Sequence, residues 1–462
     1  MNEIVCISPV DGRELARRPL WTDSELGGAL EAARRAQRGW AQLPVAERAA
    51  AALRFLEAMR ALNPQIVPEL AWQMGRPVRY GGELRSLEER VRHMAAIAER
   101  ALAPVRPADD KPGFERFIRR DPLGLVLVVA PWNYPYLTAV NTIVPGLIAG
   151  NAVILKHAAQ TILVGERFAE AMAMADLPAG LFTNVVLSHQ QTAKLLGSGA
   201  IDHVSFTGSV AGGKAISQAV GGTYTTMGLE LGGKDPAYVR ADANLSHAVE
   251  NLVDGAFFNS GQSCCGVERI YVHTDLYDRF VEQFVALTGQ YVLGDPLDQA
   301  TTLGPMAATR FAELVRAQTA EALAKGARAQ IDPAAFAANR AGSPYLAPQV
   351  LTNVDHSMQV MAEESFGPVI GIMKVRDDAE AVALMNDSAY GLTASIWSSD
   401  LEASRALAER VEAGTIYMNR CDYLDPGLAW TGVKDSGRGA SLSALGYEML
   451  TRPKSYHLRY AL

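Results

Sequence analysis

The pattern that most constrains this chain is a repeated alternation of strand and helix signals that begins near residue 125. Short apolar runs of the kind found in buried parallel strands occupy 125–130, 152–155, 185–187 and 203–206. Helical stretches such as 161–175 lie between them. A second alternation, from about 237 to 430, includes 269–272, 369–373 and 415–419. Strands that alternate with helices form β-α-β units, so we predict an α/β fold with doubly wound parallel sheets.

The part of the chain before residue 123 has a different pattern. Residues 24–103 are expected to be helical, because Phe55, Met59 and Leu62 recur at i, i+4 and i+7. Residues 104–122 are rich in proline and charge, and the alternation in 114–121 predicts an exposed hairpin.

Length and composition limit the classes of function. A chain of 462 residues with 49% hydrophobic and 20% charged residues is expected to form about two or three globular domains. The net charge is −7 without a lysine or arginine run, so no nucleic-acid partner is expected. No apolar run has membrane-spanning length, and the N-terminus lacks the pattern of a signal peptide, so no membrane partner is expected.

The cysteines indicate a reducing compartment. The chain has four, at positions 6, 264, 265 and 421. Adjacent cysteines make a poor structural disulfide, and scattered thiols form no metal framework. We therefore expect a cytoplasmic protein without a metal site.

Cys264 is a candidate nucleophile. It follows Gly-Gln-Ser at the end of an apolar, helix-like stretch, where backbone N–H groups at a turn could favour the thiolate. The segment alone leaves a buried, inert cysteine as the more frequent alternative. For Cys265 that alternative is the better reading, because neighbouring side chains point in different directions.

Two other polar residues suit the same chemistry. Glu230 lies between leucines before a Gly-Gly pair, and an apolar setting raises a carboxyl pKa toward that of a useful base. Asn133 directly follows the strand at 125–130, where its amide could hold an oxyanion. A capping or turn glutamate and a turn asparagine are the alternatives.

Two segments after strands could bind a dinucleotide. The glycine-rich stretch 206–213 opens a helix, so Ser209 and nearby N–H groups could bind a phosphate. Lys156 ends the strand at 152–155 and could contact a ribose or phosphate. An ordinary glycine-rich turn and a lysine extending toward solvent are the alternatives.

Taken together, these motifs resemble the aldehyde dehydrogenase superfamily over essentially the whole chain. Nine motifs stand in the family order: PWNYP (131–135), AGNAVILK (149–156), FTGS (206–209), LELGGK (229–234), GQSC (261–264), EESFGP (363–368), NDSAYGL (386–392), GTIYMN (414–419) and GVKDSG (432–437). The resemblance implies NAD(P)-dependent oxidation of an aldehyde to a carboxylic acid. Cys264 would be the nucleophile, Asn133 would hold the oxyanion, and Glu230 would activate the water that hydrolyses the thioester.

The resemblance also implies a domain arrangement. A Rossmann-like dinucleotide-binding domain would comprise 1–103 and 123–232, and an α/β catalytic domain 233–432. A small β oligomerisation element would comprise 104–122 and 446–462. A homodimer or homotetramer is implied, because unpaired strand edges favour aggregation.

The family pattern assigns the two binding sites. The expected cofactor contacts are Trp132, Lys156, Gly208, Ser209, Gly213, Leu231, Glu364 and Phe366. The expected substrate contacts are Tyr134, Asn141, Phe258, Asp422, Leu424 and Trp430.

The substrate residues depart from one branch of the family. Succinate-semialdehyde relatives have arginines where this chain has Asn141 and Phe258, so an uncharged aliphatic or aromatic aldehyde is expected. Arg420 is either a substitute partner for a carboxylate or an exposed arginine. A succinate-semialdehyde dehydrogenase, and a thiol esterase or binding protein on the same fold, are the alternatives.

Two further departures affect the cofactor and the base. Ala159 replaces the acid that grips the adenosine ribose in many relatives, so NADP is expected to be accepted as well as NAD. Lys156 or His157 could pair with its 2′-phosphate. An Arg-Glu pair of the family is Ala440-Ser441 here, so no auxiliary acid is expected from that loop.

Overall fold

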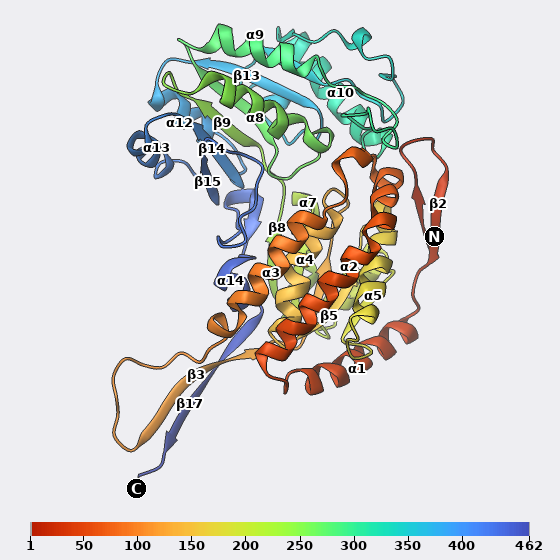
Figure 1. Cartoon of the computed structure of the whole chain (residues 1–462), viewed down its shortest axis with the longest axis vertical. Helices are drawn as coiled ribbons and strands as arrows, with labels where there is room; N and C mark the ends of the chain where they lie inside the picture. Colours follow the sequence, from red (N-terminus) through yellow and green to blue (C-terminus); the bar gives the residue numbers. More distant parts are fainter. Residues whose placement is uncertain (1, 462) are drawn as a thin grey trace.

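A computed structural model describes residues 2–461, which form two α/β parts and a projecting strand pair (Figure 1). The first part contains a six-stranded sheet in the order β16-β8-β7-β4-β5-β6. Its strands are β4 (Leu125–Val129), β5 (Ala152–Lys156), β6 (Phe182–Val185), β7 (His203–Thr207), β8 (Thr226–Glu230) and β16 (Gly437–Arg438). All pairs are parallel except β16 with β8.

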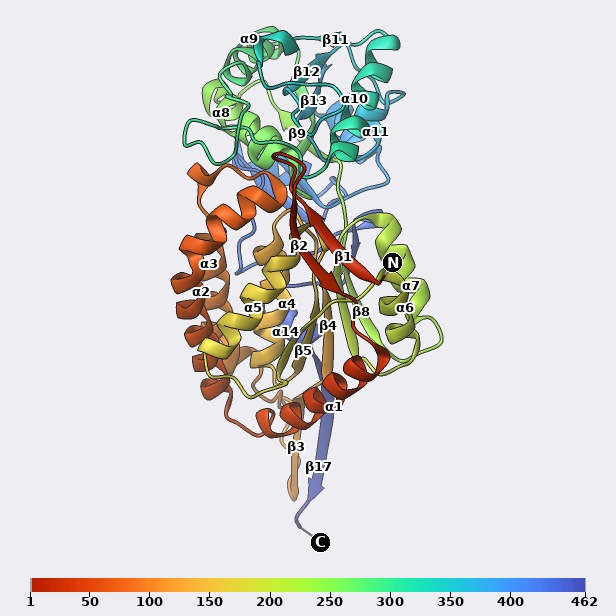
Figure 2. The ribbon, with the colours of Figure 1, turned by 90° about the vertical axis from the view of Figure 1, so that its right-hand side faces the viewer.

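Helices cover both faces of this sheet. They are α1 (Asp23–Trp40), α2 (Val45–Met74), α3 (Leu84–Ala101), α4 (Pro135–Ile148), α5 (Ile162–Met174), α6 (His189–Gly197), α7 (Val210–Val220) and α14 (Ser443–Met449). Figure 2 shows α4 and α5, backed by α2 and α3, on one side of the sheet and α6 and α7 on the other. Every residue of β4 and β5 is buried, which explains their unbroken apolar runs.

The second part contains a seven-stranded sheet in the order β11-β12-β13-β10-β9-β14-β15. Its strands are β9 (Asp235–Val239), β10 (Val267–His273), β11 (Arg328–Ala329), β12 (Gln349–Thr352), β13 (Val369–Val375), β14 (Thr393–Trp397) and β15 (Thr415–Met418). Its helices are α8 (Leu245–Phe257), α9 (Tyr277–Thr288), α10 (Thr309–Ala324), α11 (Gln359–Ala362), α12 (Asp378–Asn386) and α13 (Leu401–Ala408). The predicted α/β architecture is confirmed.

The strand order positions the functional region. The chain passes from β4 to β5 and β6, then crosses back to β7 on the other side of β4. A crevice forms where the strand order reverses, outside the carboxyl ends of β4 and β7. The segments 131–135 and 208–213 begin at these strand ends.

Three local expectations differ from the structure. The strand expected at 185–187 is β6, which ends at Val185; Leu187 is buried but not paired. The helical region 24–103 is interrupted at 41–44 and 75–83. The expected local hairpin at 114–121 is wrong: β3 (Phe114–Pro122) pairs along its whole length with β17 (Thr451–Arg459). The pairing of β3 with a nearby segment is limited to one isolated bridge, between Val105 and Ile118.

The two ends of the chain are arranged differently. A small hairpin of β1 (Glu3–Ile7) and β2 (Glu14–Pro19) lies along the first part, whereas β3 and β17 project from it (Figures 1 and 2). The helix α14 packs on α3 and α4, so the paired strand begins only at Thr451, five residues after the expected boundary at 446. Within residues 2–461, no helix is both long and apolar enough to cross a membrane.

Candidate active site

Two cavities meet between the two parts of the molecule. The strand-end cavity has a volume of about 250 Å³ and lies at the ends of β4, β7 and β8. The thiol cavity has a volume of about 230 Å³ and is lined by residues from α3 and α4 and by loop residues near 422 and 430. Cys264 and Glu230 line both cavities. The junction of the cavities is therefore the candidate active site.

The turn before Cys264 is held in place by hydrogen bonds. Asn259 and Ser260 have φ angles of 54° and 57°, an uncommon backbone state for residues other than glycine. The Asn259 amide donates to the Asn133 carbonyl at 3.2 Å, and the Ser260 hydroxyl donates to the Gly304 carbonyl at 2.8 Å. These contacts fix the Cys264 thiol at the mouth between the cavities.

Cys265 has a different environment. It is buried, and its thiol donates to a carboxyl oxygen of Asp422 at 3.1 Å. Interaction with the Cys264 thiol, together with burial, raises the pKa of Cys265 well above its ordinary value. A protonated, hydrogen-bonded thiol is a poor nucleophile, which agrees with the structural reading of Cys265.

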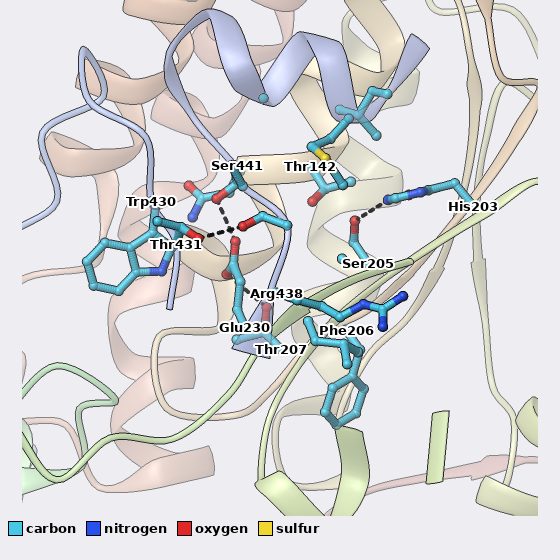
Figure 3. Close-up of a pocket in the computed structure, with 18 residues that line it drawn as sticks. Thr142, His203, Ser205, Phe206, Thr207, Glu230, Trp430, Thr431, Arg438 and Ser441 are labelled. Carbon is cyan, nitrogen blue, oxygen red and sulfur yellow. Dashed lines mark hydrogen bonds between the residues drawn. The ribbon is translucent and has the colours of Figure 1, made fainter. Parts of the chain in front are cut away.

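Glu230 ends β8 and carries two hydrogen bonds on its carboxyl group. The Ser441 hydroxyl donates to one oxygen at 2.5 Å and the Thr207 hydroxyl to the other at 3.1 Å, as Figure 3 shows. Burial raises the pKa of Glu230, whereas the two donors and the cationic Arg90 lower it. The raised pKa expected from the apolar sequence context is confirmed in direction.

Asn133 lies beside Cys264 on the strand-end cavity. Its carbonyl accepts from the Arg76 guanidinium at 2.6 Å as well as from Asn259. Arg76 in turn pairs with buried Glu83 at 2.6 Å. The side-chain amide of Asn133 makes no hydrogen bond with any residue from 2 to 461, so its N–H₂ group is available to a ligand.

The strand-end cavity contains most of the expected cofactor contacts. Six of them line it: Trp132, Gly208, Ser209, Leu231, Glu364 and Phe366. Phe311 of α10, which the sequence did not indicate, stacks on Trp132 with 4.9 Å between ring centroids. Burial raises the pKa of Glu364 to about 8, although the Gly233 N–H donates to its carboxyl group at 3.0 Å.

Gly213 and Lys156 lie outside this lining. Gly213 is in α7, where a Cβ would lie 2.7 Å from Leu231, so it allows the helix to pack closely. Lys156 is buried at the end of β5, where burial lowers the pKa of its ammonium group. Its side chain forms no ion pair or hydrogen bond within the described residues, so it is free to bind a ligand.

The residues present fit a dinucleotide. Ser209 caps the 11-residue helix α7, and its hydroxyl accepts from the Gly212 N–H. The N–H groups of that first turn and the unpaired Lys156 suit a pyrophosphate or ribose phosphate. His157 does not contribute charge, because burial lowers its pKa to about 4 and its ring faces the Pro135 carbonyl. A buried, neutral His157 does not support the suggested pairing with a phosphate.

All six expected substrate contacts line the thiol cavity: Tyr134, Asn141, Phe258, Asp422, Leu424 and Trp430. Arg90 of α3 lines it too, although the sequence analysis missed this residue. The Arg90 guanidinium donates to the Leu137 carbonyl and to the Asn141 side-chain oxygen, both at 2.9 Å. Arg420 is exposed, stacks on Tyr423 and does not line the cavity, which agrees with its interpretation as an exposed arginine.

Fold and site together define a doubly wound α/β protein with a thiol and a carboxyl group where a dinucleotide-type groove meets a second cavity. A model of the Aldehyde dehydrogenase family matches residues 1–456. The aldehyde dehydrogenase of Paenarthrobacter nicotinovorans is 34% identical over 446 residues, which are 96% of this chain and 97% of that protein. The chain belongs to the aldehyde dehydrogenase family, and its activity is the oxidation of an aldehyde.

Solved structures show the same fold. Succinic semialdehyde dehydrogenase from Streptococcus pyogenes, in complex with NADP⁺, matches with a TM-score of 0.93 at 28% identity, over 99% of this chain and 100% of that one. PnpE in complex with nicotinamide adenine dinucleotide matches with a TM-score of 0.92 at 28% identity, over 100% of this chain and 95% of that one.

Proposed function

We propose that the chain oxidises an aldehyde to the carboxylic acid with NAD or NADP, using Cys264 as nucleophile and Glu230 as base. One observation carries this proposal: both side chains line the strand-end cavity and the thiol cavity at once. A dinucleotide in the first cavity and an aldehyde in the second would meet beside these two groups.

In the first half of the reaction, the Cys264 thiolate attacks the carbonyl carbon. The free amide of Asn133 and the Cys264 N–H donate to the oxygen that becomes negative, which stabilises the tetrahedral state. A bound nicotinamide supplies the hydride acceptor. Loss of hydride from the tetrahedral carbon leaves a thioester on Cys264.

In the second half, Glu230 takes a proton from a water molecule that attacks the thioester. The C–S bond then breaks, and the Cys264 thiolate and the carboxylic acid are released. The raised pKa of Glu230 suits this role, because a base whose pKa is nearer neutrality accepts a proton more readily.

Rapid-mixing kinetics of two variants test the proposal. Cys264→Ala should lose both the NAD(P)H burst and turnover, whereas the matched Cys265→Ser variant should retain them. Glu230→Gln should retain a burst of about one NAD(P)H per active site and then turn over about 10²–10⁴-fold more slowly. Turnover by Cys264→Ala, or normal steady-state turnover by Glu230→Gln, would contradict the assignment. A cysteine that hydrolyses only esters would give no NAD(P)H with any aldehyde.

For the cofactor, we propose that both NAD and NADP are accepted. Ala159 is exposed near the end of β5 and presents no negative charge to a 2′-phosphate, and Lys156 is unpaired nearby in the chain. The solved relatives named above were determined with one or the other of these two cofactors.

For the substrate, we propose an uncharged aldehyde whose tail carries a hydrogen-bond acceptor oxygen. Arg90 has no carboxylate partner within the described residues, and its Nε is buried without a hydrogen bond. Burying this unpaired group costs free energy, and a ligand oxygen that accepts from the guanidinium would offset part of that cost. Asp254 and Asp422 line the same cavity, and their carboxyl groups disfavour a substrate with a negatively charged tail. A panel that compares butanal, 4-hydroxybutanal and succinate semialdehyde in the parent and Arg90→Met distinguishes these substrates; the parent should prefer the hydroxyaldehyde.

We further propose the domain roles, assembly and compartment. The six-stranded part would bind the dinucleotide, the seven-stranded part would supply Cys264, and β3 with β17 would join copies into a dimer or tetramer. The exposed edges of this strand pair support assembly. Four free cysteines support a reducing cytoplasm.

A further inference from the structure

A third cavity is lined by Glu230 but not by Cys264. This cavity, called the polar cavity for the hydroxyl and imidazole groups that face it although apolar side chains also line it, has a volume of about 30 Å³, enough for a water molecule. Glu230 lines it together with Ser441 and Thr207, the two donors to its carboxyl group. Ser205 and His203 line the same space (Figure 3). The carboxyl group of Glu230 therefore also faces a cavity that neither the proposed substrate nor the proposed dinucleotide occupies.

One face of β7 is polar along its length. His203, Ser205 and Thr207 alternate along the strand and so point to the same face of the sheet. Residues of α4 and α14 line the cavity beside these three side chains. Three hydrogen-bonding groups in register therefore form a line from Glu230 toward the start of β7.

Hydrogen bonds extend this line to the surface. The Ser205 hydroxyl lies 3.2 Å from Nε2 of His203, and Nδ1 of His203 lies 2.8 Å from the Thr226 hydroxyl. His203 is buried and pairs across the sheet with Thr226, which is exposed. Burial lowers the pKa of His203 to about 4, so the ring is neutral near pH 7. A neutral imidazole can accept a proton at one nitrogen while it releases one from the other.

The proposed reaction needs such an outlet. Oxidation of an aldehyde by NAD(P)⁺ and water yields a carboxylate, NAD(P)H and two protons, and Glu230 holds one of these protons after it activates the water. Glu230 must lose it before the next cycle. Substrate and dinucleotide would occupy the other two cavities that Glu230 lines.

We propose that Glu230 returns its proton to solvent through the polar cavity, by way of the Ser441 or Thr207 hydroxyl, enclosed water, Ser205, His203 and Thr226. Each transfer breaks one O–H or N–H bond as the next forms, and rotation of the hydroxyl groups resets the line. His203 and Ser205 are positioning residues, because neither contacts substrate or cofactor. This inference rests on the proposed role of Glu230.

The decisive measurement is the steady-state rate that follows the burst in His203→Leu and Ser205→Ala. Both should acylate normally with a chromogenic ester and give a full NAD(P)H burst with aldehyde and cofactor. The steady-state rate should fall by about tenfold, because Glu230 must lose its proton before each new cycle; this is a smaller loss than removal of the base itself. Its solvent deuterium isotope effect should rise, and small buffers such as imidazole should restore part of the rate.

Val204→Ala is the matched control. Val204 is buried on the opposite face of the same strand, so its truncation loosens β7 without touching the polar line. An unchanged steady-state rate and isotope effect in His203→Leu would overturn the route. A loss equal to that of Val204→Ala, without buffer rescue, would also overturn it. Normal deacylation in Glu230→Gln would instead reject the proposed base, so the two failures are distinguishable.

Discussion

At the scale of single residues, the carboxyl group of Glu230 shows how neighbours set reactivity. Burial alone would favour the neutral acid, which cannot act as a base. Ser441 and Thr207 each donate a hydrogen bond to the charged form, and Arg90 adds a nearby positive charge. The carboxyl group is therefore poised between the neutral form that burial favours and the charged form that its donors favour.

Removing one donor should shift the pH dependence of deacylation. Thr207→Val deletes the 3.1 Å hydrogen bond to Glu230 and leaves the charged form less stabilised, so the pKa of Glu230 should rise further. The deacylation rate increases with pH as Glu230 ionises, so in the variant this increase should occur at a higher pH than in the parent. Thr142→Val is the control, because Thr142 lines the polar cavity without bonding to Glu230. If the pH dependence of deacylation is the same in Thr207→Val as in the parent, this hydrogen bond does not set the pKa of Glu230.

Cofactor selection is expected to depend on the side chain at position 159. Ala159→Glu places a negative charge where the family pattern expects one, so it should repel the 2′-phosphate of NADP and leave NAD unaffected. The ratio of kcat/KM for NAD over NADP should rise by about tenfold or more. Ala159→Gln, with similar size and no charge, should keep the parent ratio. Equal ratios in the glutamate and glutamine variants would show that position 159 does not face the phosphate.

Sequence indicated some of these residues and not others, for physical reasons. Cys264 and Glu230 stand in motifs of fixed spacing. Arg90 lies in an arginine-rich helix, and its one distinguishing signal is that it shares the buried stripe of Leu87, Val91 and Met94. For Ser441, the sequence shows only that the Arg-Glu pair of the family is replaced. That the Ser441 hydroxyl reaches Glu230 depends on how β16 places the following loop, which the sequence does not reveal.

At the scale of elements, a buried ion pair holds the loop that carries Glu364 and Phe366. The Lys234 ammonium lies 2.6 Å from the Glu268 carboxylate, with side-chain exposures of 0% and 6%. The same carboxylate accepts the backbone N–H groups of Ser365 and Phe366 at 2.8 and 2.9 Å. Lys234, between β8 and β9, and Glu268 of β10 therefore fix one wall of the strand-end cavity.

Breaking this pair from one side should destabilise the protein strongly. Lys234→Met leaves the Glu268 charge buried without its partner, so the free energy of unfolding should fall by about 3–5 kcal/mol. Urea denaturation measures this change. The double variant Lys234→Met with Glu268→Gln removes both charges and should recover part of the loss. A single variant as stable as the parent would mean that water reaches Glu268.

Strand pairing was harder to predict than strand existence. The alternation in 114–121 gave a strand correctly, but its partner lies more than three hundred residues away at Thr451–Arg459. Periodicity describes which residues share a face and carries no information on a distant partner. The apolar run at 185–187 misplaced β6 for a related reason: Leu187 is buried by packing outside the sheet.

At the scale of the whole molecule, β3 and β17 form a two-stranded sheet that projects away from both α/β parts (Figure 1). An isolated two-stranded sheet is marginally stable in water, and its outer edges can pair with other strands. Ile118 and Leu458 on this pair are 37% and 48% exposed. A second copy of the chain would cover both the edges and these side chains.

Mass measurements across a concentration series therefore test the assembly. The parent should have the mass of a dimer or tetramer at micromolar concentration, and Ile118→Lys with Leu458→Lys should shift it toward the monomer, because buried lysines at a subunit contact oppose association. Leu401→Lys is the control, since Leu401 is 50% exposed on α13, remote from the strand pair. A parent that remains monomeric, or a double variant with unchanged mass, would show that this sheet does not join subunits. Since β17 follows α14, which packs on α3 beside the thiol cavity, dissociation should also loosen that wall and raise KM for the aldehyde more than kcat falls.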